Sequence, residues 1–199
     1  MERLLPVLVT PRFELRPPAI EDAPALLAFY GRCDAVPEAT RFLLRPLPRD
    51  LDEVRARVGP EVRMFSAQRS WFQWLIRERG ADASVDPRVL GYAAFVRWDH
   101  DNRRSEVAYA VDPARWGAGV AVEAVRAIVA FARAELSLHR VEAHVDPKNV
   151  ASARVAHKLG LTLEGTLRDH VRTRAGYADT AVYASVPAAE EGVGADRAD

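Results

Sequence analysis

One stretch constrains the fold more than any other: a strand-like run that passes through two glycines into a long helical run. Residues 105–111 place apolar side chains at alternate positions, which is typical of a strand. Residues 117–136 are rich in alanine, contain no proline and repeat apolar side chains at three- and four-residue steps. Gly117 and Gly119 lie at the junction. The sequence therefore predicts a strand, a glycine turn and a helix in direct succession.

This junction has the chemistry of an anion site. The first backbone N–H groups of a helix have no partner inside the helix and lie at the positive end of its dipole. Glycines allow a phosphate to approach those N–H groups closely. The turn therefore predicts a place for a pyrophosphate, although two glycines alone fit an ordinary turn equally well.

Composition narrows the class of protein. With 199 residues, 49% hydrophobic and 28% charged, the chain fits one globular domain over residues 1–186, followed by a flexible tail at 187–199. Lysine plus arginine and aspartate plus glutamate both number 28, so we expect neither nucleic acid nor a membrane as partner. We expect Cys33 to be a buried free thiol, and the histidines show no metal-ligand spacing. With no signal segment at the N-terminus, we expect a cytoplasmic protein without metal.

The rest of the chain predicts a mixed sheet with helices on both faces, in the α/β (α+β) class. The expected strands cover residues 12–16, 71–77, 89–98, 103–111, 139–145, 161–167 and 178–186. The expected helices cover residues 20–30, 50–58, 117–136 and 150–159, the last with Asn149 as its N-cap and Gly160 at its C-terminal end. A charged arm at residues 168–176 is expected to link the last two strands.

Three segments together resemble the GNAT superfamily of acyl-CoA-dependent N-acyltransferases, in particular the RimJ/RimL-like branch that acetylates the N-terminal alanine or serine of ribosomal proteins. They are residues 105–124, residues 145–161, and residues 164–169 with Asp179 and Tyr183. The resemblance covers residues 11–186. It implies a GNAT fold, with a mostly antiparallel central sheet of six to seven strands, and acetyl-CoA as the co-substrate.

The resemblance also implies which residues hold acetyl-CoA. The glycine turn would bind the pyrophosphate, and a strand that splays from its neighbour would pair with the pantetheine arm. The implied residues are Tyr109, Ala110, Val111, Trp116, Gly117, Ala118, Gly119, Val120, Ala121 and Asn149. We expect Trp116 to pack beneath the turn. Ala114 and Leu161 depart from the pattern, since the superfamily usually has Gln or Arg at the first position and an aromatic at the second.

The implied reaction is direct attack of a neutral amine on the acetyl thioester. Glu106 is the candidate base, acting through water, and Ser152 is the candidate donor to the leaving thiolate. Each has a plain structural alternative, because Glu106 is also a polar strand residue and Ser152 is also placed to cap a helix. Tyr109 fits either a core position or a contact with the acyl group.

Three functions remain open from the sequence. The first is transfer to the N-terminal α-amine of a protein or peptide, and the second is transfer to a small amine or antibiotic, or from another acyl-CoA. The third is a CoA-binding sensor without turnover. For the oligomeric state, a homodimer is an open alternative to a monomer. A dinucleotide-binding domain is disfavoured because Val122 stands where a third glycine is needed. The acceptor pocket is expected among residues 33–48, the loop near Trp71 and residues 168–177.

Overall fold

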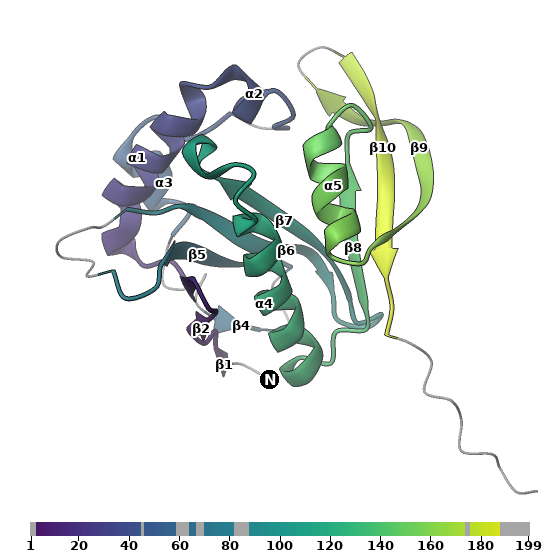
Figure 1. The fold of residues 1–199 in the computed structure, drawn as a ribbon, viewed down its shortest axis with the longest axis horizontal. Coiled ribbons are helices and arrows are strands. Elements are labelled where there is room, and N and C mark those ends of the chain that lie inside the picture. The colour runs from purple at the N-terminus through teal and green to yellow at the C-terminus, as the bar shows by residue number, and fades with distance from the viewer. Residues whose placement is uncertain are drawn as a thin grey trace, which may run out of the picture.

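An eight-stranded sheet runs through the molecule, and helices cover both of its faces (Figure 1). The computed structural model describes residues 3–44, 46–58, 64–66, 70–81, 88–173 and 176–187. Across the sheet the strands are β2 (Leu8–Val9), β3 (Phe13–Arg16), β5 (Phe72–Glu78), β6 (Gly91–Asp99), β7 (Arg104–Val111), β8 (Arg140–Val145), β10 (Gly176–Ser185) and β9 (Thr162–Thr173). All neighbours are antiparallel except β7 and β8. Two further short strands, β1 (Arg3–Leu4) and β4 (Met64–Phe65), pair separately.

The helices divide between the two faces. One face packs on α4 (Val120–Glu135) and α5 (Val150–Lys158), and the other on α1 (Ala23–Asp34) and α3 (Leu51–Arg55). A short α2 (Pro37–Thr40) follows α1. Trp74 and Leu75 are neighbours on β5, yet Trp74 lies in the α4 core and Leu75 in the α1 core. Alternate side chains of a buried strand thus supply two separate cores.

The predicted mixed sheet with helices on both faces is confirmed, and the strand count is corrected from six or seven to eight. The additional strand, β2, has two residues, too few to show alternation. The glycine helix begins at Val120 rather than at residue 117, because residues 116–119 form the turn itself. None of the described helices has both the length and the apolar character that crossing a membrane requires.

The predicted charged arm is wrong in form, because β9 continues as one strand to Thr173. The β9–β10 ladder is irregular at residues 168–170 and resumes at Val171, opposite Ala178. β9 is an edge strand whose side chains are mostly exposed, so polar residues are tolerated along it. Cys33 is buried as expected, and burial raises the pKa of its thiol to about 11. The predicted tail lies outside the described residues from residue 188 onward.

The parallel pair is where the sheet opens. β7 and β8 pair only over Arg104–Glu106 and Arg140–Glu142, in the register Glu106 opposite Glu142. Beyond that point β7 continues beside β6 up to Val111, whereas β8 continues beside β10. The two strands therefore part, and one edge of residues 107–111 faces an opening instead of a neighbouring strand.

Candidate active site

The glycine turn begins at a buried carboxylate. Asp112 accepts a hydrogen bond from Ala114 N at 3.0 Å, and its other oxygen accepts from Arg32 Nε at 2.7 Å and from Arg88 at 3.0 Å. Burial raises the pKa of Asp112, but these hydrogen bonds outweigh burial and hold that pKa below its usual range. Asp112 thereby anchors the start of the turn to α1 and to the segment before β6.

Gly117 and Gly119 shape the turn itself. Their φ angles are +76° and +77°, in the left-handed region that favours glycine. Gly119 is the N-cap of α4 and supplies no side-chain cap to the N–H groups of the first turn. A Cβ added to Gly117 would meet no described atom within 4 Å, so the space above the turn is open. This geometry can receive the oxygens of a phosphate.

Two residues that the sequence reasoning missed brace the same turn. Arg12 donates to the carbonyl oxygen of Ala118 at 2.8 Å and, through Nε, to Glu123 at 2.7 Å. Glu123 also accepts from Thr10 Oγ1 at 2.7 Å. Arg12 is more than 100 residues from its partners along the chain, so no local sequence pattern joins them.

The expectation for Trp116 is wrong. Its side chain is 49% exposed rather than packed beneath the turn, and its Nε1 donates to the carbonyl oxygen of Val111 at 2.9 Å. The carbonyl of Val111 lies where β8 no longer pairs with β7, so the indole supplies it with a donor. Trp116 therefore secures the end of β7 to the turn.

On the α4 and α5 side of the opening, two hydroxyl groups meet. Tyr109 Oη on β7 lies 2.7 Å from Ser152 Oγ on α5. Asn149 Oδ1 accepts from Ser152 N at 3.0 Å, which confirms Asn149 as the N-cap and leaves the Ser152 hydroxyl for Tyr109. Burial raises the pKa of Tyr109 and outweighs the opposing effect of the Ser152 bond, so the phenol stays protonated at neutral pH.

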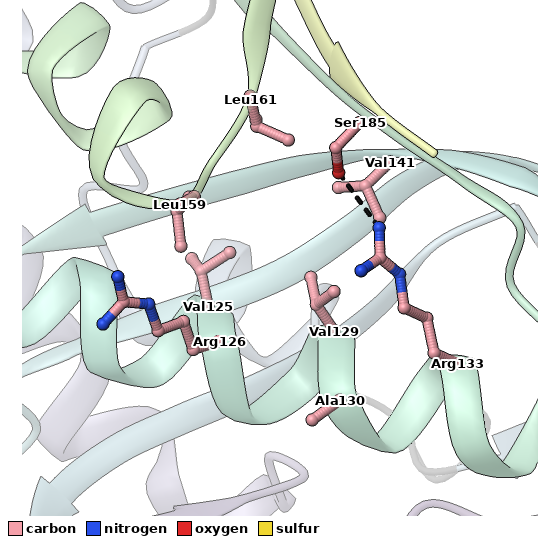
Figure 2. A pocket seen from close by; sticks show the side chains of 9 residues that line it. All are labelled: Val125, Arg126, Val129, Ala130, Arg133, Val141, Leu159, Leu161 and Ser185. Atoms are coloured by element: carbon pink, nitrogen blue, oxygen red, sulfur yellow. Dashed lines mark hydrogen bonds between the residues drawn. The ribbon is translucent and has the colours of Figure 1, made fainter. Parts of the chain in front are cut away.

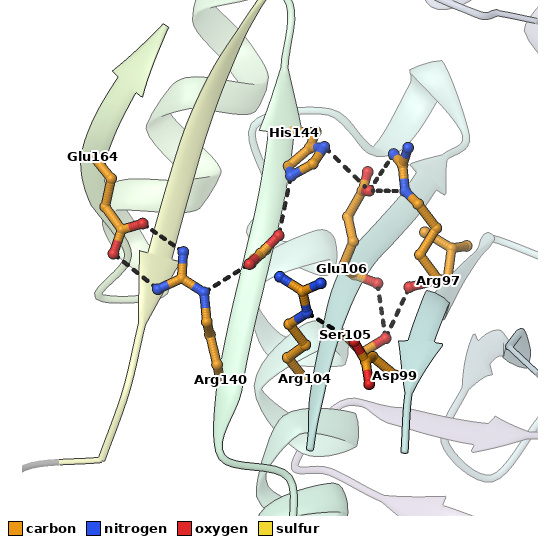
Figure 3. Close-up of polar contacts among 10 residues, drawn as sticks. Arg97, Asp99, Arg104, Ser105, Glu106, Arg140, His144 and Glu164 are labelled. Carbon is orange, nitrogen blue, oxygen red and sulfur yellow. Dashed lines mark hydrogen bonds and ion pairs between the residues drawn. The ribbon is translucent and has the colours of Figure 1, made fainter. Parts of the chain in front are cut away.

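On the opposite face, charged side chains form a row across four strands (Figure 3). Arg97 on β6 pairs with Glu106 on β7, which adjoins β8. Three members of the row lie along β8, and the last lies on β9: His144, Glu142, Arg140 and then Glu164. Glu106 accepts from Arg97 Nε at 2.7 Å, and Glu142 accepts from Arg140 Nε at 2.6 Å. Side chains of β7 alternate in direction, so Glu106 and Tyr109 lie on opposite faces of the opening.

A small hollow of about 210 Å³ adjoins this row. It is lined by Arg97, Asp99, Arg104, Ser105, Glu106, Glu142 and His144. A larger hollow of about 310 Å³ lies between α4 and the ends of β8 and β10 (Figure 2). Its lining consists of aliphatic residues, Arg126, Arg133 and Ser185, and Arg133 donates to Ser185 Oγ at 3.0 Å. Among the described residues, no carboxylate or imidazole lines the larger hollow, whereas Glu106, Glu142 and His144 line the smaller one.

Sequence reasoning found Glu106 but missed its neighbours. The signal was present in β8, where Arg140, Glu142 and His144 alternate with buried Val141, Ala143 and Val145. Three ionisable side chains on one face of a strand indicate a polar site rather than a second core. Among the described residues no group of three or more His, Cys, Asp or Glu side chains is arranged to hold a metal ion.

The site thus combines a mixed sheet that parts at its parallel pair with a helix that begins in a glycine turn. Residues 12–162 match the family model described as the acetyltransferase (GNAT) domain. The chain therefore belongs to the GNAT family and is an N-acetyltransferase.

Named relatives agree with this assignment. The uncharacterized N-acetyltransferase p20 of Bacillus licheniformis is 27% identical over 177 residues, covering 88% of this chain and 93% of the relative. The probable N-acetyltransferase YjcK of Bacillus subtilis is 40% identical over 106 residues, covering 53% of this chain and 59% of the relative.

Solved structures of low sequence identity share the fold. RimL, a ribosomal L7/L12 alpha-N-protein acetyltransferase in complex with coenzyme A, has a TM-score of 0.73 at 20% identity, covering 91% of this chain and 98% of that one. The microcin C7 self-immunity acetyltransferase MccE, in complex with acetyl-CoA and AMP, has a TM-score of 0.78 at 17% identity, with coverages of 92% and 98%.

Proposed function

We propose that this enzyme transfers an acetyl group from acetyl-CoA to the N-terminal α-amine of a protein or peptide. One observation carries the proposal: the opening between β7 and β8 has a pair of hydroxyl groups on one face and a carboxylate on the other. A leaving thiolate needs a proton donor and an attacking amine needs a proton acceptor, so the two faces suit the two ends of one acyl transfer.

The residues around the opening fit acetyl-CoA. Glycine N–H groups and the uncapped first turn of α4, at residues 117–121, suit the pyrophosphate. The backbone groups of Tyr109 and the N–H of Val111 point to the β8 side of β7, where no strand pairs with them, and they suit the amides of the pantetheine arm. When bound, acetyl-CoA supplies an activated acyl group on a thioester. Asn149 fixes the first turn of α5, which holds Ser152 beside that group.

Glu106 serves the amine. It lies at the last paired position of β7, three residues before Tyr109, which corresponds to about 10 Å along a strand. A chain of water molecules spans that distance and carries the proton from the amine nitrogen to the carboxylate. The nitrogen lone pair then forms the new bond to the carbonyl carbon.

Ser152 serves the thiolate. As the carbon–sulfur bond breaks, the sulfur keeps the electron pair and Ser152 Oγ donates a hydrogen bond or a proton to it. Tyr109 Oη, at 2.7 Å, passes its proton to Ser152, and a proton from solvent restores the phenol when CoA leaves. The products are an N-acetyl amide and free CoA thiol.

An α-amine suits this weakly basic arrangement better than a lysine side chain. With reference pKa values near 8 and 10.4, about one α-amine in ten is free base at neutral pH, against fewer than one lysine in a thousand. The structural likeness to RimL, a ribosomal L7/L12 alpha-N-protein acetyltransferase, supports the same acceptor class.

The test combines binding and turnover. The purified protein is titrated by calorimetry with acetyl-CoA, CoA and NADH, and thiol release is followed with peptides that begin in alanine or serine. The same peptides blocked by N-terminal acetylation are the matched controls, and lysine peptides and small amines complete the panel. We expect binding of both CoA species and thiol release only with free N-termini. Release with small amines alone would replace the acceptor class, and CoA binding without release for any amine would favour a sensor.

A further inference from the structure

His144 lies at the mouth of the opening on the face that carries Glu106 (Figure 3). Glu142 is the last residue of β8 that pairs with β7, and Ala143 points to the opposite side, into the core. His144 is therefore the first side chain on this face beyond the point where the strands part. It stands one pleat closer to the reacting region than Glu106 does.

The contacts of the imidazole define its tautomer. Burial raises the pKa of Glu142, but hydrogen bonds from Arg140 and with His144 outweigh burial and hold that pKa below its usual range. Glu142 is therefore ionised and can only accept hydrogen bonds. His144 Nε2, at 3.1 Å from Glu142 Oε2, must be the donor. In a neutral ring this leaves the lone pair on Nδ1.

That lone pair accepts no hydrogen bond from any residue that the structure describes. Nδ1 is buried, and Glu106 Oε2 lies 3.5 Å from it. An imidazole lone pair and a carboxylate oxygen repel each other, whereas a proton on Nδ1 would be attracted by carboxylates on both sides of the ring. A proton placed on Nδ1 would therefore point at the carboxylate of Glu106.

Several charged and titratable side chains surround the imidazole of His144. Arg97 on β6 pairs with Glu106, and Arg140 pairs with Glu142 on β8 itself. His170 on β9 approaches the ring, with 6.1 Å between the two centroids. Two further charged residues, Asp99 and Arg104, line the same hollow and pair with each other. Each carboxylate beside the ring pairs with an arginine, so the charges are balanced around a neutral ring and a proton on Nδ1 adds one positive charge to the row.

We propose that Nδ1 of His144 is the final acceptor of the proton that the attacking amine loses. This inference rests on the proposed acetyl transfer and names the group that completes it. The amine nitrogen releases one proton through water and Glu106, its lone pair forms the carbon–nitrogen bond, and the Nδ1 lone pair takes up the proton. Solvent receives the proton when the acetylated product leaves, which restores the neutral ring.

The test is the His144→Ala variant, with His170→Ala as the matched control on the neighbouring strand. We expect His144→Ala to lower kcat/KM by about 100-fold and to leave acetyl-CoA binding unchanged. The shortened side chain opens space beside the hollow, so added imidazole should restore a large part of the lost rate. The His170→Ala variant should stay within about threefold of wild type, because an exposed surface change rarely perturbs a neighbouring site strongly.

The pH profile separates a proton acceptor from a structural residue. The wild type should lose activity on acidification through two ionisations, one of the amine and one of the enzyme. His144→Ala should retain the first and lose the second. An active variant with the wild-type profile, or a slow one that imidazole does not restore, would overturn the role of His144 while leaving the acetyltransferase itself established. No thiol release by the wild type with any amine would instead overturn the proposed function.

A measurement on the wild type covers the case in which His144→Ala does not fold. Nitrogen-15 NMR of the ring reports which nitrogen carries the proton. We expect the Nε2–H tautomer at high pH, with protonation of Nδ1 in the same pH range as the enzyme ionisation in the kinetic profile. An Nδ1–H neutral tautomer would contradict the proposal directly.

Discussion

The candidate site has two halves, one built from backbone groups and the other from side chains. Around the glycine turn, the groups that suit a phosphate are backbone N–H groups, and side chains such as Asp112 and Arg12 only hold that backbone in place. Across the opening, the groups that suit a reaction are side chains, Glu106 and His144 on one face and Ser152 and Tyr109 on the other. A backbone site tolerates most side-chain changes, whereas a side-chain site is lost through single atoms.

The largest effect should come from a substitution on β6 that pushes the backbone of β7 away. In Gly91→Ala, the new Cβ would lie 2.2 Å from the carbonyl oxygen of Ala110, so the two strands must separate. We expect the free energy of unfolding to fall by about 3 kcal/mol in urea denaturation. Gly31→Ala is the control, since its Cβ meets no described atom within 4 Å and α1 should gain about 1 kcal/mol. Equal stabilities of the two variants would contradict the close approach.

The next largest effect should be the loss of activity caused by an isosteric substitution in the side-chain half of the site. Glu106→Gln keeps the shape and removes the charge, and we expect kcat/KM to fall by about 100-fold while calorimetry finds acetyl-CoA affinity unchanged. Glu164→Gln, at the outer end of the same row, should cost about threefold at most because its pair with Arg140 is half-exposed. Full activity in Glu106→Gln would remove this residue from the reaction.

Asp112→Asn tests the anchor of the backbone half. The folded pKa of Asp112 lies below its unfolded value, so the ionised carboxylate stabilises the fold above the unfolded pKa of about 4, and that stability is lost as pH falls through the folded pKa. We expect the variant to lose about 2 kcal/mol at pH 7, and less below pH 4. Asp52→Asn, in an exposed pair on α3, should change stability by less than about 0.5 kcal/mol. A loss independent of pH would point to packing instead.

The smallest effect should come from the hydroxyl pair. We expect Ser152→Ala to lower kcat by about tenfold, because solvent can partly replace the donor to the thiolate. Tyr109→Phe should have a similar effect, and the double variant should be little worse than either single variant if the two hydroxyls act as a unit. Stopped-flow measurement of thiol release would follow all three. Multiplicative losses would show that the two hydroxyls act independently.

The same contrast explains what could be predicted from the sequence. The glycine turn was predictable because a strand, two glycines and a helix are consecutive, and Asn149 and Gly160 mark the ends of α5 by local rules. The row around His144 was not predicted, since it brings β8 and β9 together with the β6–β7 hairpin, from which both are separated in sequence by α4. Strand neighbours are set by tertiary pairing, which local periodicity does not encode.

The opening also separates the eight-stranded sheet into an N-terminal half and a C-terminal half. Every strand on one side of it comes from residues 8–111, and every strand on the other side from residues 140–185, so the polypeptide passes from one side to the other through α4. A break in residues 136–139 would leave each half of the sheet within its own fragment. The enzyme is therefore suited to being split into two pieces whose reassociation would rebuild the seam between them.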